Sequence, residues 1–253
     1  MWAEPLPIAW TGGELTASPF PHIYAPDFFE APYLSALQED LRRRLSGGLD
    51  PNRHPERFRP LGTHHDAWTW IPRPEDVGPL SLFRSPAWWR WISARFPHLM
   101  LTRDVVTEYH HHLVGSRAGF VHSDFTTCDF PDNQLSDGMN PWFYGSLRGA
   151  AARPAERVMR SVAVLLYLGP GGWQEGDGGE TGLYGSAARE SLGRRVPPLP
   201  NSLLLFEITP RSYHRFLYKR RLERNSVIQW FHEPMAEKLA RHPGSQPVYN
   251  NFG

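Results

Sequence analysis

His122 and Asp124 stand two residues apart at the end of the apolar run that begins at Gly119. Side chains on a strand repeat their direction every two residues, so a strand here would put the imidazole and the carboxylate on one face. Together they would supply two of the three protein ligands in the facial site that suits non-haem Fe(II). A surface histidine beside a turn aspartate would show the same short pattern. Residues farther along the chain are therefore needed to distinguish a metal-binding pair from this alternative.

A second group of polar residues follows about ninety positions later. His214 stands within a short polar-aromatic run, Arg224 comes ten residues after it, and Ser226 lies two positions beyond. A strand would place Arg224 and Ser226 on one face. A planar, permanently charged guanidinium suits bidentate binding of a carboxylate. His122, Asp124, His214, Arg224 and Ser226 together form a constellation that is far less likely by chance than its parts.

Two other histidine groups compete for the metal. His64 and Asp66 repeat the His-x-Asp pattern, but they stand in a proline- and glycine-broken stretch without an apolar strand before them. We expect them at the rim of a cleft or on the surface. The triplet His110 to His112 lies in a predicted strand, where neighbouring side chains point to opposite faces and cannot all converge on one ion. We expect that triplet to be solvated or at the rim.

The elements that must position these side chains are mostly strands. Phe29, Tyr33, Leu37 and Leu41 recur every four residues and predict an amphipathic helix over 28–45, followed by a second helix over 84–97. We expect a mainly β protein with supporting α-helices. Residues 1–100 would form an N-terminal helical and extended support region, and residues 101–253 the catalytic core, within a single integrated domain. Short apolar or alternating runs predict core strands at 101–112, 116–124, 158–168, 179–186, 201–208, 212–216 and 223–231.

The stretch 126–156 lacks a regular pattern and follows directly on Asp124. Long loops inside compact domains are usually functional or disordered. We interpret this one as a lid over the site, with Trp142 or Tyr144 as substrate contacts. Arg117 and Arg215 stand near the motifs, but exposed arginines are commonplace and neither is assigned a role.

Composition narrows the functional class. A formal net charge of +1 on 253 residues gives no footprint of nucleic-acid binding. No apolar run reaches the roughly 18 residues of a membrane helix, no signal peptide is visible, and the single cysteine, Cys128, fits a reducing compartment. We expect a cytoplasmic protein that binds neither nucleic acid nor membrane, with its oligomeric state unknown. Lysine occurs only at Lys219 and Lys238, which suggests a GC-rich bacterial genome.

The order of these motifs resembles that of the Fe(II)- and 2-oxoglutarate-dependent oxygenases, specifically the prolyl-4-hydroxylase-like branch. The resemblance covers residues 101–232 and includes a Gly-Gly-Glu-Thr segment that ends at Thr181. It implies a double-stranded β-helix (jelly-roll) core. It also implies that Tyr109 contacts 2-oxoglutarate, although Tyr109 lies farther from the metal motif than the family pattern has it. The implied Fe(II) ligands are His122, Asp124 and His214, and the implied 2-oxoglutarate contacts are Arg224 and Ser226.

The resemblance further implies hydroxylation of an unactivated aliphatic C–H bond, with O2 consumed, succinate and CO2 released, and ascorbate as a potential stimulant. Asp124 fills a position that halogenases of this group leave vacant, which favours hydroxylation over halogenation, while desaturation and cyclisation stay open. We expect the substrate to be a small molecule, an amino acid or a peptidic metabolite. One alternative is a prolyl hydroxylase acting on a protein or peptide. The other is a non-catalytic cupin-like binding protein, but His110-x-His112 lacks the glutamate of that motif.

Overall fold

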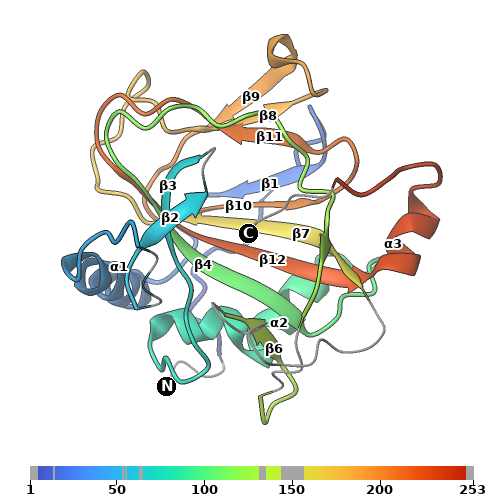
Figure 1. Ribbon diagram of the computed structural model, residues 1–253, viewed down its shortest axis with the longest axis horizontal. Helices are drawn as coiled ribbons and strands as arrows, with labels where there is room; N and C mark the ends of the chain where they lie inside the picture. Colours follow the sequence, from blue (N-terminus) through green and yellow to red (C-terminus); the bar gives the residue numbers. More distant parts are fainter. Residues whose placement is uncertain are drawn as a thin grey trace.

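The computed structural model describes residues 5–13, 15–52, 54, 56–62, 65–130, 135–143 and 157–248 (Figure 1). Its strands form two sheets. The larger has nine strands in the order β1-β10-β7-β12-β4-β3-β2, with β5 beside β7 and β6 beside β4, and the smaller has the order β11-β8-β9. The strand bounds are β1 His22–Ala25, β2 Arg59–Gly62, β3 His65–Trp70, β4 Asp104–His112, β5 Thr127–Cys128, β6 Asn140–Trp142, β7 Val158–Tyr167, β8 Thr181–Tyr184, β9 Leu192–Val196, β10 Ser202–Glu207, β11 Tyr213–Phe216 and β12 Arg224–Pro234.

Few helices accompany these strands. The bounds are α1 Ala31–Ser46, α2 Pro86–Ser93 and α3 Met235–Arg241, with 3-10 turns η1 Pro79–Arg84 and η2 Arg189–Ser191. Figure 1 shows α1 and α2 on one side of the larger sheet and the small sheet on the other. Every pairing between these strands is antiparallel except that of β4 with β6. The mainly β prediction with supporting helices is confirmed.

The two faces of the larger sheet have different environments. On β4, Val105 and Tyr109 belong to the apolar core that α1 and α2 cover. The alternate positions, such as Glu108 and His110, line a pocket on the opposite face. The period-2 direction of strand side chains therefore separates a helix-covered core from a polar cavity.

The helices cover the sheet through the residues that the sequence pattern predicts. In α1 the side chains of Tyr33, Leu37 and Leu41 are buried, as expected for one stripe of an amphipathic helix. In α2 the backbone N–H of Trp88 donates to the Ser85 side chain at 3.2 Å, which caps the helix start. The predicted helix 84–97 is thus shorter, and η1 precedes it.

The predicted strand 116–124 is wrong. This segment has no regular strand. A backbone bridge between His122 and His214 and a hydrogen bond of 3.0 Å from the Gly119 N–H to the Phe216 carbonyl join it to the small sheet. Asp124 has φ 55°, in the left-handed region. The metal motif therefore sits at a backbone turn, and strand alternation does not apply to it.

The predicted lid 126–156 is in part regular. β5 pairs with β7, and β6 pairs with β4. Tyr144 and the rest of 144–156 lie outside the described residues.

The first hundred residues contribute β1, β2 and β3 to the larger sheet. Within the part of the chain described, no helix is long and apolar enough to cross a bilayer.

Candidate metal centre

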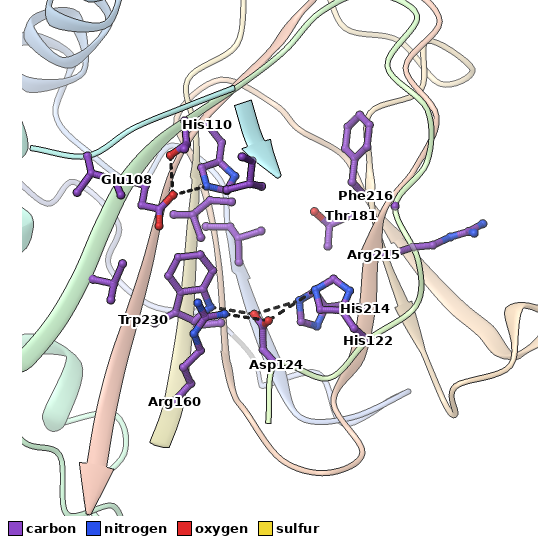
Figure 2. A pocket seen from close by; sticks show the side chains of 18 of the residues that line it. Glu108, His110, His122, Asp124, Arg160, Thr181, His214, Arg215, Phe216 and Trp230 are labelled. Carbon is purple, nitrogen blue, oxygen red and sulfur yellow. Dashed lines mark hydrogen bonds and ion pairs between the residues drawn. The ribbon is translucent and has the colours of Figure 1, made fainter. Parts of the chain in front are cut away.

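A pocket of about 410 Å³ opens between the two sheets, and Figure 2 shows its polar lining. His122 and Asp124 enter it from the turn before β5, and His214 enters from β11. Arg160 reaches it from β7, and Trp230 from β12. Residues from widely separated segments therefore meet at one place.

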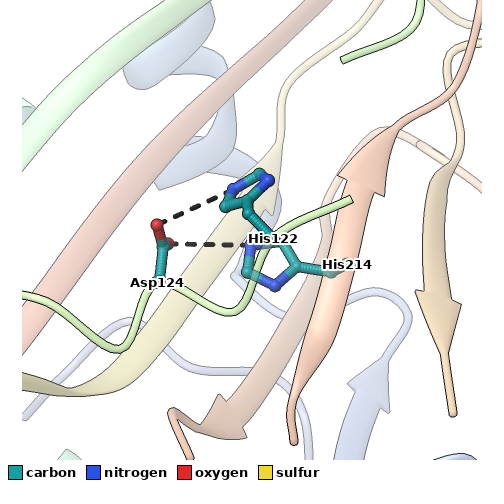
Figure 3. Close-up of side chains that lie close together, drawn as sticks. All are labelled: His122, Asp124 and His214. Carbon is teal, nitrogen blue, oxygen red and sulfur yellow. Dashed lines mark ion pairs between the residues drawn. The ribbon is translucent and has the colours of Figure 1, made fainter. Parts of the chain in front are cut away.

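His122, Asp124 and His214 converge with their potential ligand atoms within 4.8 Å of one another (Figure 3). His122 Nε2 lies 3.7 Å from Asp124 Oδ1, and His214 Nε2 lies 3.6 Å from Asp124 Oδ2. The two histidines also exchange backbone hydrogen bonds of 3.0 and 2.8 Å. The three side chains are thus close enough to share one small ion.

Backbone carbonyls fix which nitrogen each imidazole turns toward the carboxylate. His122 Nδ1 lies 3.0 Å from the carbonyl oxygen of Phe120, and His214 Nδ1 lies 3.0 Å from that of Ser212. A carbonyl only accepts, so each Nδ1 carries the proton and donates it there. Each Nε2 then presents its lone pair to the centre, as in metal-binding histidines whose other nitrogen donates to a backbone carbonyl.

Arg160 and Trp230 hold the Asp124 carboxylate from behind. Arg160 Nη1 lies 3.0 Å from Oδ1, and the Trp230 indole N–H donates to Oδ2 at 2.8 Å. The Arg160 guanidinium carbon lies 3.9 Å from the Trp230 ring centre. Burial alone would raise the pKa of Asp124, but the Arg160 charge and the two histidines hold it well below its usual range. The carboxylate is therefore ionised and oriented before any ion arrives.

Arg224 marks a second polar region of the pocket. It is 3% exposed, its Nη2 donates to Thr181 Oγ1 at 3.3 Å, and its Nε has no partner among the described residues. Burial lowers the pKa of Arg224. The neighbouring Ser226 is fully buried, and its Oγ also lacks a partner within the described chain. These orphaned donors fit a buried carboxylate ligand.

Tyr167 and Thr181 belong to the same region, and the sequence prediction missed this role for both. Their hydroxyl oxygens lie 2.8 Å apart, and the Arg224 guanidinium carbon lies 5.1 Å from the Tyr167 ring centre. Thr181 stood in the Gly-Gly-Glu-Thr segment, which could have pointed to it. Tyr167 ends an apolar strand without a distinguishing pattern.

The prediction that Tyr109 contacts the cosubstrate is wrong. Its hydroxyl donates to Asp40 Oδ2 at 3.1 Å on the helix-covered face of the sheet. The pocket-facing residues of β4 are instead Val106, Glu108, His110 and His112. His112 stacks on Phe216 with ring centres 3.9 Å apart.

The histidine triplet was expected to be solvated or at the rim, but His110, His111 and His112 are all buried. The expectation that neighbouring side chains of this triplet point to opposite faces of the strand is confirmed. His110 and His112 line the pocket, while His111 Nδ1 donates to Asn225 Oδ1 at 2.7 Å.

The remaining candidates stand apart from the triad. Asp66 accepts three hydrogen bonds from Arg117, and His64 lies outside the described residues. Trp142 and Arg215 line the pocket, although Figure 2 shows Arg215 directed away from the triad. Arg215 Nε donates to the Tyr184 hydroxyl at 2.7 Å.

Known proteins share both sequence and fold with this chain. Residues 110–232 match the 2OG-Fe(II) oxygenase superfamily. A curated prolyl 3-hydroxylase from Xenopus laevis is 35% identical over 94 residues, which cover 35% of this chain and only 18% of that protein.

Two solved structures share the fold. A Pseudomonas putida prolyl-4-hydroxylase superposes with a TM-score of 0.57 at 20% identity, covering 84% of this chain and 92% of its own. A Trichoplax adhaerens prolyl hydroxylase, solved with a peptide fragment of a hypoxia inducible factor, gives 0.55 at 18% identity, covering 89% and 87%. The predicted jelly-roll core is thereby confirmed.

Proposed function

Because residues 110–232 belong to the 2OG-Fe(II) oxygenase superfamily, we propose that this protein is an Fe(II)- and 2-oxoglutarate-dependent hydroxylase that acts on a prolyl residue of a peptide or protein. The observation that carries the proposal is the convergence of His122, Asp124 and His214 in a pocket that also holds the buried guanidinium of Arg224. A ligand set of two imidazoles and one carboxylate with open positions is typical of non-haem Fe(II) oxygenases.

The residues at the metal centre fit Fe(II) and prepare its site. His122 and His214 would each bind through Nε2, and Asp124 would supply one oxygen. Bound Fe(II) would activate O2 as 2-oxoglutarate loses CO2 to give succinate, and this chemistry hydroxylates an aliphatic C–H bond. Arg160 and Trp230 would keep the carboxylate oriented, since outer hydrogen bonds of this kind strengthen metal binding.

Arg224 would bind the far carboxylate of 2-oxoglutarate. Its guanidinium has already lost water through burial, and among the described residues it has no acidic partner within salt-bridge distance. A carboxylate would satisfy its free Nε and the orphaned Ser226 hydroxyl. Thr181 would hold the guanidinium in place through its hydroxyl.

The size of the pocket supports a substrate that inserts one side chain. The cavity of about 410 Å³ lies toward the low end for ligand sites, and 2-oxoglutarate would take part of it. The remaining space beside Trp230 suits a compact apolar ring such as that of proline. The rest of a peptide would then lie across the mouth.

Exposed apolar side chains support this placement. Phe120 lines the pocket and is 43% exposed, and its segment hydrogen-bonds to that of Phe216 through the Gly119 N–H. Leu113 and Tyr218, on the same paired segments, are 44% and 48% exposed. A peptide or protein surface would cover these groups, whereas a small hydrophilic molecule would leave them in water. This contrast favours a peptide over the small molecule or amino acid that the sequence analysis also allowed.

Succinate formation tests the proposal. The protein is incubated with Fe(II), ascorbate, 2-oxoglutarate and either proline-containing peptides or free proline. We expect peptide-dependent succinate and a product heavier by one oxygen atom on the proline ring, and neither with His122→Ala. Turnover of free proline but of no peptide would contradict the peptide assignment. Succinate without any oxygenated proline would contradict the prolyl assignment.

A further inference from the structure

A buried polar cluster on the pocket wall has no role in holding iron or 2-oxoglutarate. Glu108 and His110 lie on β4, and Thr69 lies beside them on β3. Thr69 Oγ1 donates to Glu108 Oε2 at 2.6 Å, and His110 Nε2 lies 2.9 Å from the same oxygen. Figure 2 shows Glu108 and His110 on the side of the pocket away from His122 and His214. Glu108 is only 7% exposed, so its carboxylate is almost fully desolvated.

The two carboxylate oxygens of Glu108 differ in their contacts. Both hydrogen bonds go to Oε2, and Oε1 accepts none from the residues described. Burial would raise the pKa of Glu108, but the hydrogen bond and charge of His110, with help from Thr69 and Arg59, hold it below the ordinary value. The group is therefore a carboxylate at neutral pH. Glu108 lines the pocket, so Oε1 could accept a hydrogen bond from an N–H donor that enters it.

The other ligands of the pocket do not meet this need. Arg160, a cation of the metal centre, is engaged by Asp124 at 3.0 Å and lies over Trp230. Arg59 also lines the pocket, and its charge helps to lower the pKa of Glu108, but no hydrogen bond or ion pair joins the two side chains. The cosubstrate is a dianion, which the Glu108 carboxylate would repel. Glu108 also faces Ile228 across the β4–β12 ladder, between the levels of Arg224 and Trp230. Since none of the described residues donates to Oε1, an N–H group of the substrate is a suitable partner for it.

We propose that Glu108 Oε1 accepts a hydrogen bond from an N–H group of the substrate, close to the position that is hydroxylated. The proposal rests on the proposed function and specifies which substrates the same site selects. The donor is either a backbone amide next to the target residue or the amine of a free amino acid. Thr69 and His110 would position the carboxylate for it.

Removing the donor and the acceptor in turn tests the proposal. The protein is loaded with 2-oxoglutarate and Ni(II) in place of Fe(II), and ligand binding is followed by tryptophan fluorescence. The ligands are acetyl-Gly-Pro-Gly-amide, two analogues in which an ester oxygen replaces one glycine N–H, and free proline with its N-acetyl derivative. Glu108→Met removes the acceptor at similar length, and Glu108→Gln keeps it without the charge. Asp129→Asn is the matched control, because Asp129 also lines the pocket but makes no contact with the cluster.

We expect one ester replacement, or acetylation of proline, to weaken binding to the wild type about tenfold or more, the size of a hydrogen bond to a charged group. With Glu108→Met the same replacement should cost less than about threefold, and Glu108→Gln should lie between. Asp129→Asn should behave as wild type. An ester effect identifies a peptide amide, and an acetylation effect identifies an amine.

A uniform loss for all ligands in Glu108→Met would show a purely structural role and overturn the proposal, as would no loss at all. Succinate from the Fe(II) enzyme with the same ligands reports on the proposed function separately. One outcome is that the ester or acetyl replacement costs less in Glu108→Met than in the wild type, that this also holds for a peptide with alanine in place of proline, and that no succinate forms. This outcome supports the Glu108 subsite and rejects prolyl turnover. If succinate forms but the replacement costs the same in Glu108→Met as in the wild type, prolyl turnover is supported and the Glu108 subsite is rejected.

Discussion

Replacing Arg224 by methionine should have opposite effects on 2-oxoglutarate binding and on the stability of the free protein. In the wild type the guanidinium is 3% exposed, and its hydrogen bond within the described chain goes to the neutral hydroxyl of Thr181. A bound carboxylate would add two charge-assisted hydrogen bonds, each contributing about 1.5–3 kcal/mol. Arg224→Met should therefore weaken 2-oxoglutarate binding by about 3–6 kcal/mol, which is on the order of 10² to 10⁴-fold in Kd.

The free protein should become more stable in the same variant. A buried cation costs several kcal/mol of desolvation. The Thr181 hydrogen bond and the rings of Tyr167 and Phe216, each 5.1 Å from the guanidinium carbon, offset about half of this cost if each contributes about 1 kcal/mol. A net gain of about 1–2 kcal/mol would raise Tm by roughly 2–6 °C for a chain of this length.

Calorimetric titration of 2-oxoglutarate into the Ni(II)-loaded protein measures the first effect, and a thermal melt of the metal-free protein measures the second. Arg224→Lys keeps the charge but loses the planar geometry, so its binding should be intermediate. Arg215→Met is the matched control, because Arg215 lines the same pocket but is bound to Tyr184. Binding by Arg224→Met within about threefold of wild type would refute the assignment of Arg224 to the cosubstrate.

Three further predictions concern the metal centre and the pocket rim. Trp230→Phe removes the indole N–H that Asp124 accepts at 2.8 Å, so Fe(II) affinity should fall about 10- to 100-fold in competition with a chromogenic chelator. His214→Ala removes one of the two proposed imidazole ligands, so iron should no longer co-elute with the protein in gel filtration. Arg117→Ala should return the pKa of Asp66 from about 2 toward its usual value near 3.9, measured by carboxyl NMR, because Arg117 hydrogen bonds lower it.

A control variant tests the iron predictions, and the direction of a pH dependence tests the Asp66 prediction. His111→Ala should keep its iron, because His111 faces Asn225 and not the pocket. A lowered folded-state pKa means that the Asp66 contribution to stability is complete above about pH 4 and is lost as the pH falls toward 2. It should be small, since the pair is largely exposed. A pH dependence of opposite sign, or iron retention by His214→Ala, would contradict the structure-based argument.

The sequence allowed the convergence of the metal triad to be predicted, but for a reason that was partly wrong. The expected strand through His122 and Asp124 does not form, and the two side chains meet because Asp124 takes φ 55°. The residue types and their spacing still predicted which side chains converge, although the predicted backbone conformation was wrong. A facial metal site requires only that its ligands converge, whatever the backbone between them. Backbone turns at non-glycine residues leave little trace in a sequence.

Tyr109 shows the limit more clearly. All nine residues of β4 are buried, so alternation of apolar and polar residues cannot tell which face meets the pocket. The polar identity of Glu108 and His110 was the available signal, because buried polar groups gather where a cavity or partner can satisfy them. Arg160 and Trp230 contact Asp124 from two distant segments of the chain. No local sequence pattern predicts these contacts.

The paired backbones of His122 and His214 have a consequence for handling the protein. Their two mutual hydrogen bonds, of 3.0 and 2.8 Å, set the separation of the imidazoles without help from an ion. A chelator should therefore strip the centre while leaving the chain folded. Apoprotein purified in air could then be refilled with Fe(II), or with a spectroscopically convenient substitute such as Co(II), by simple addition at room temperature.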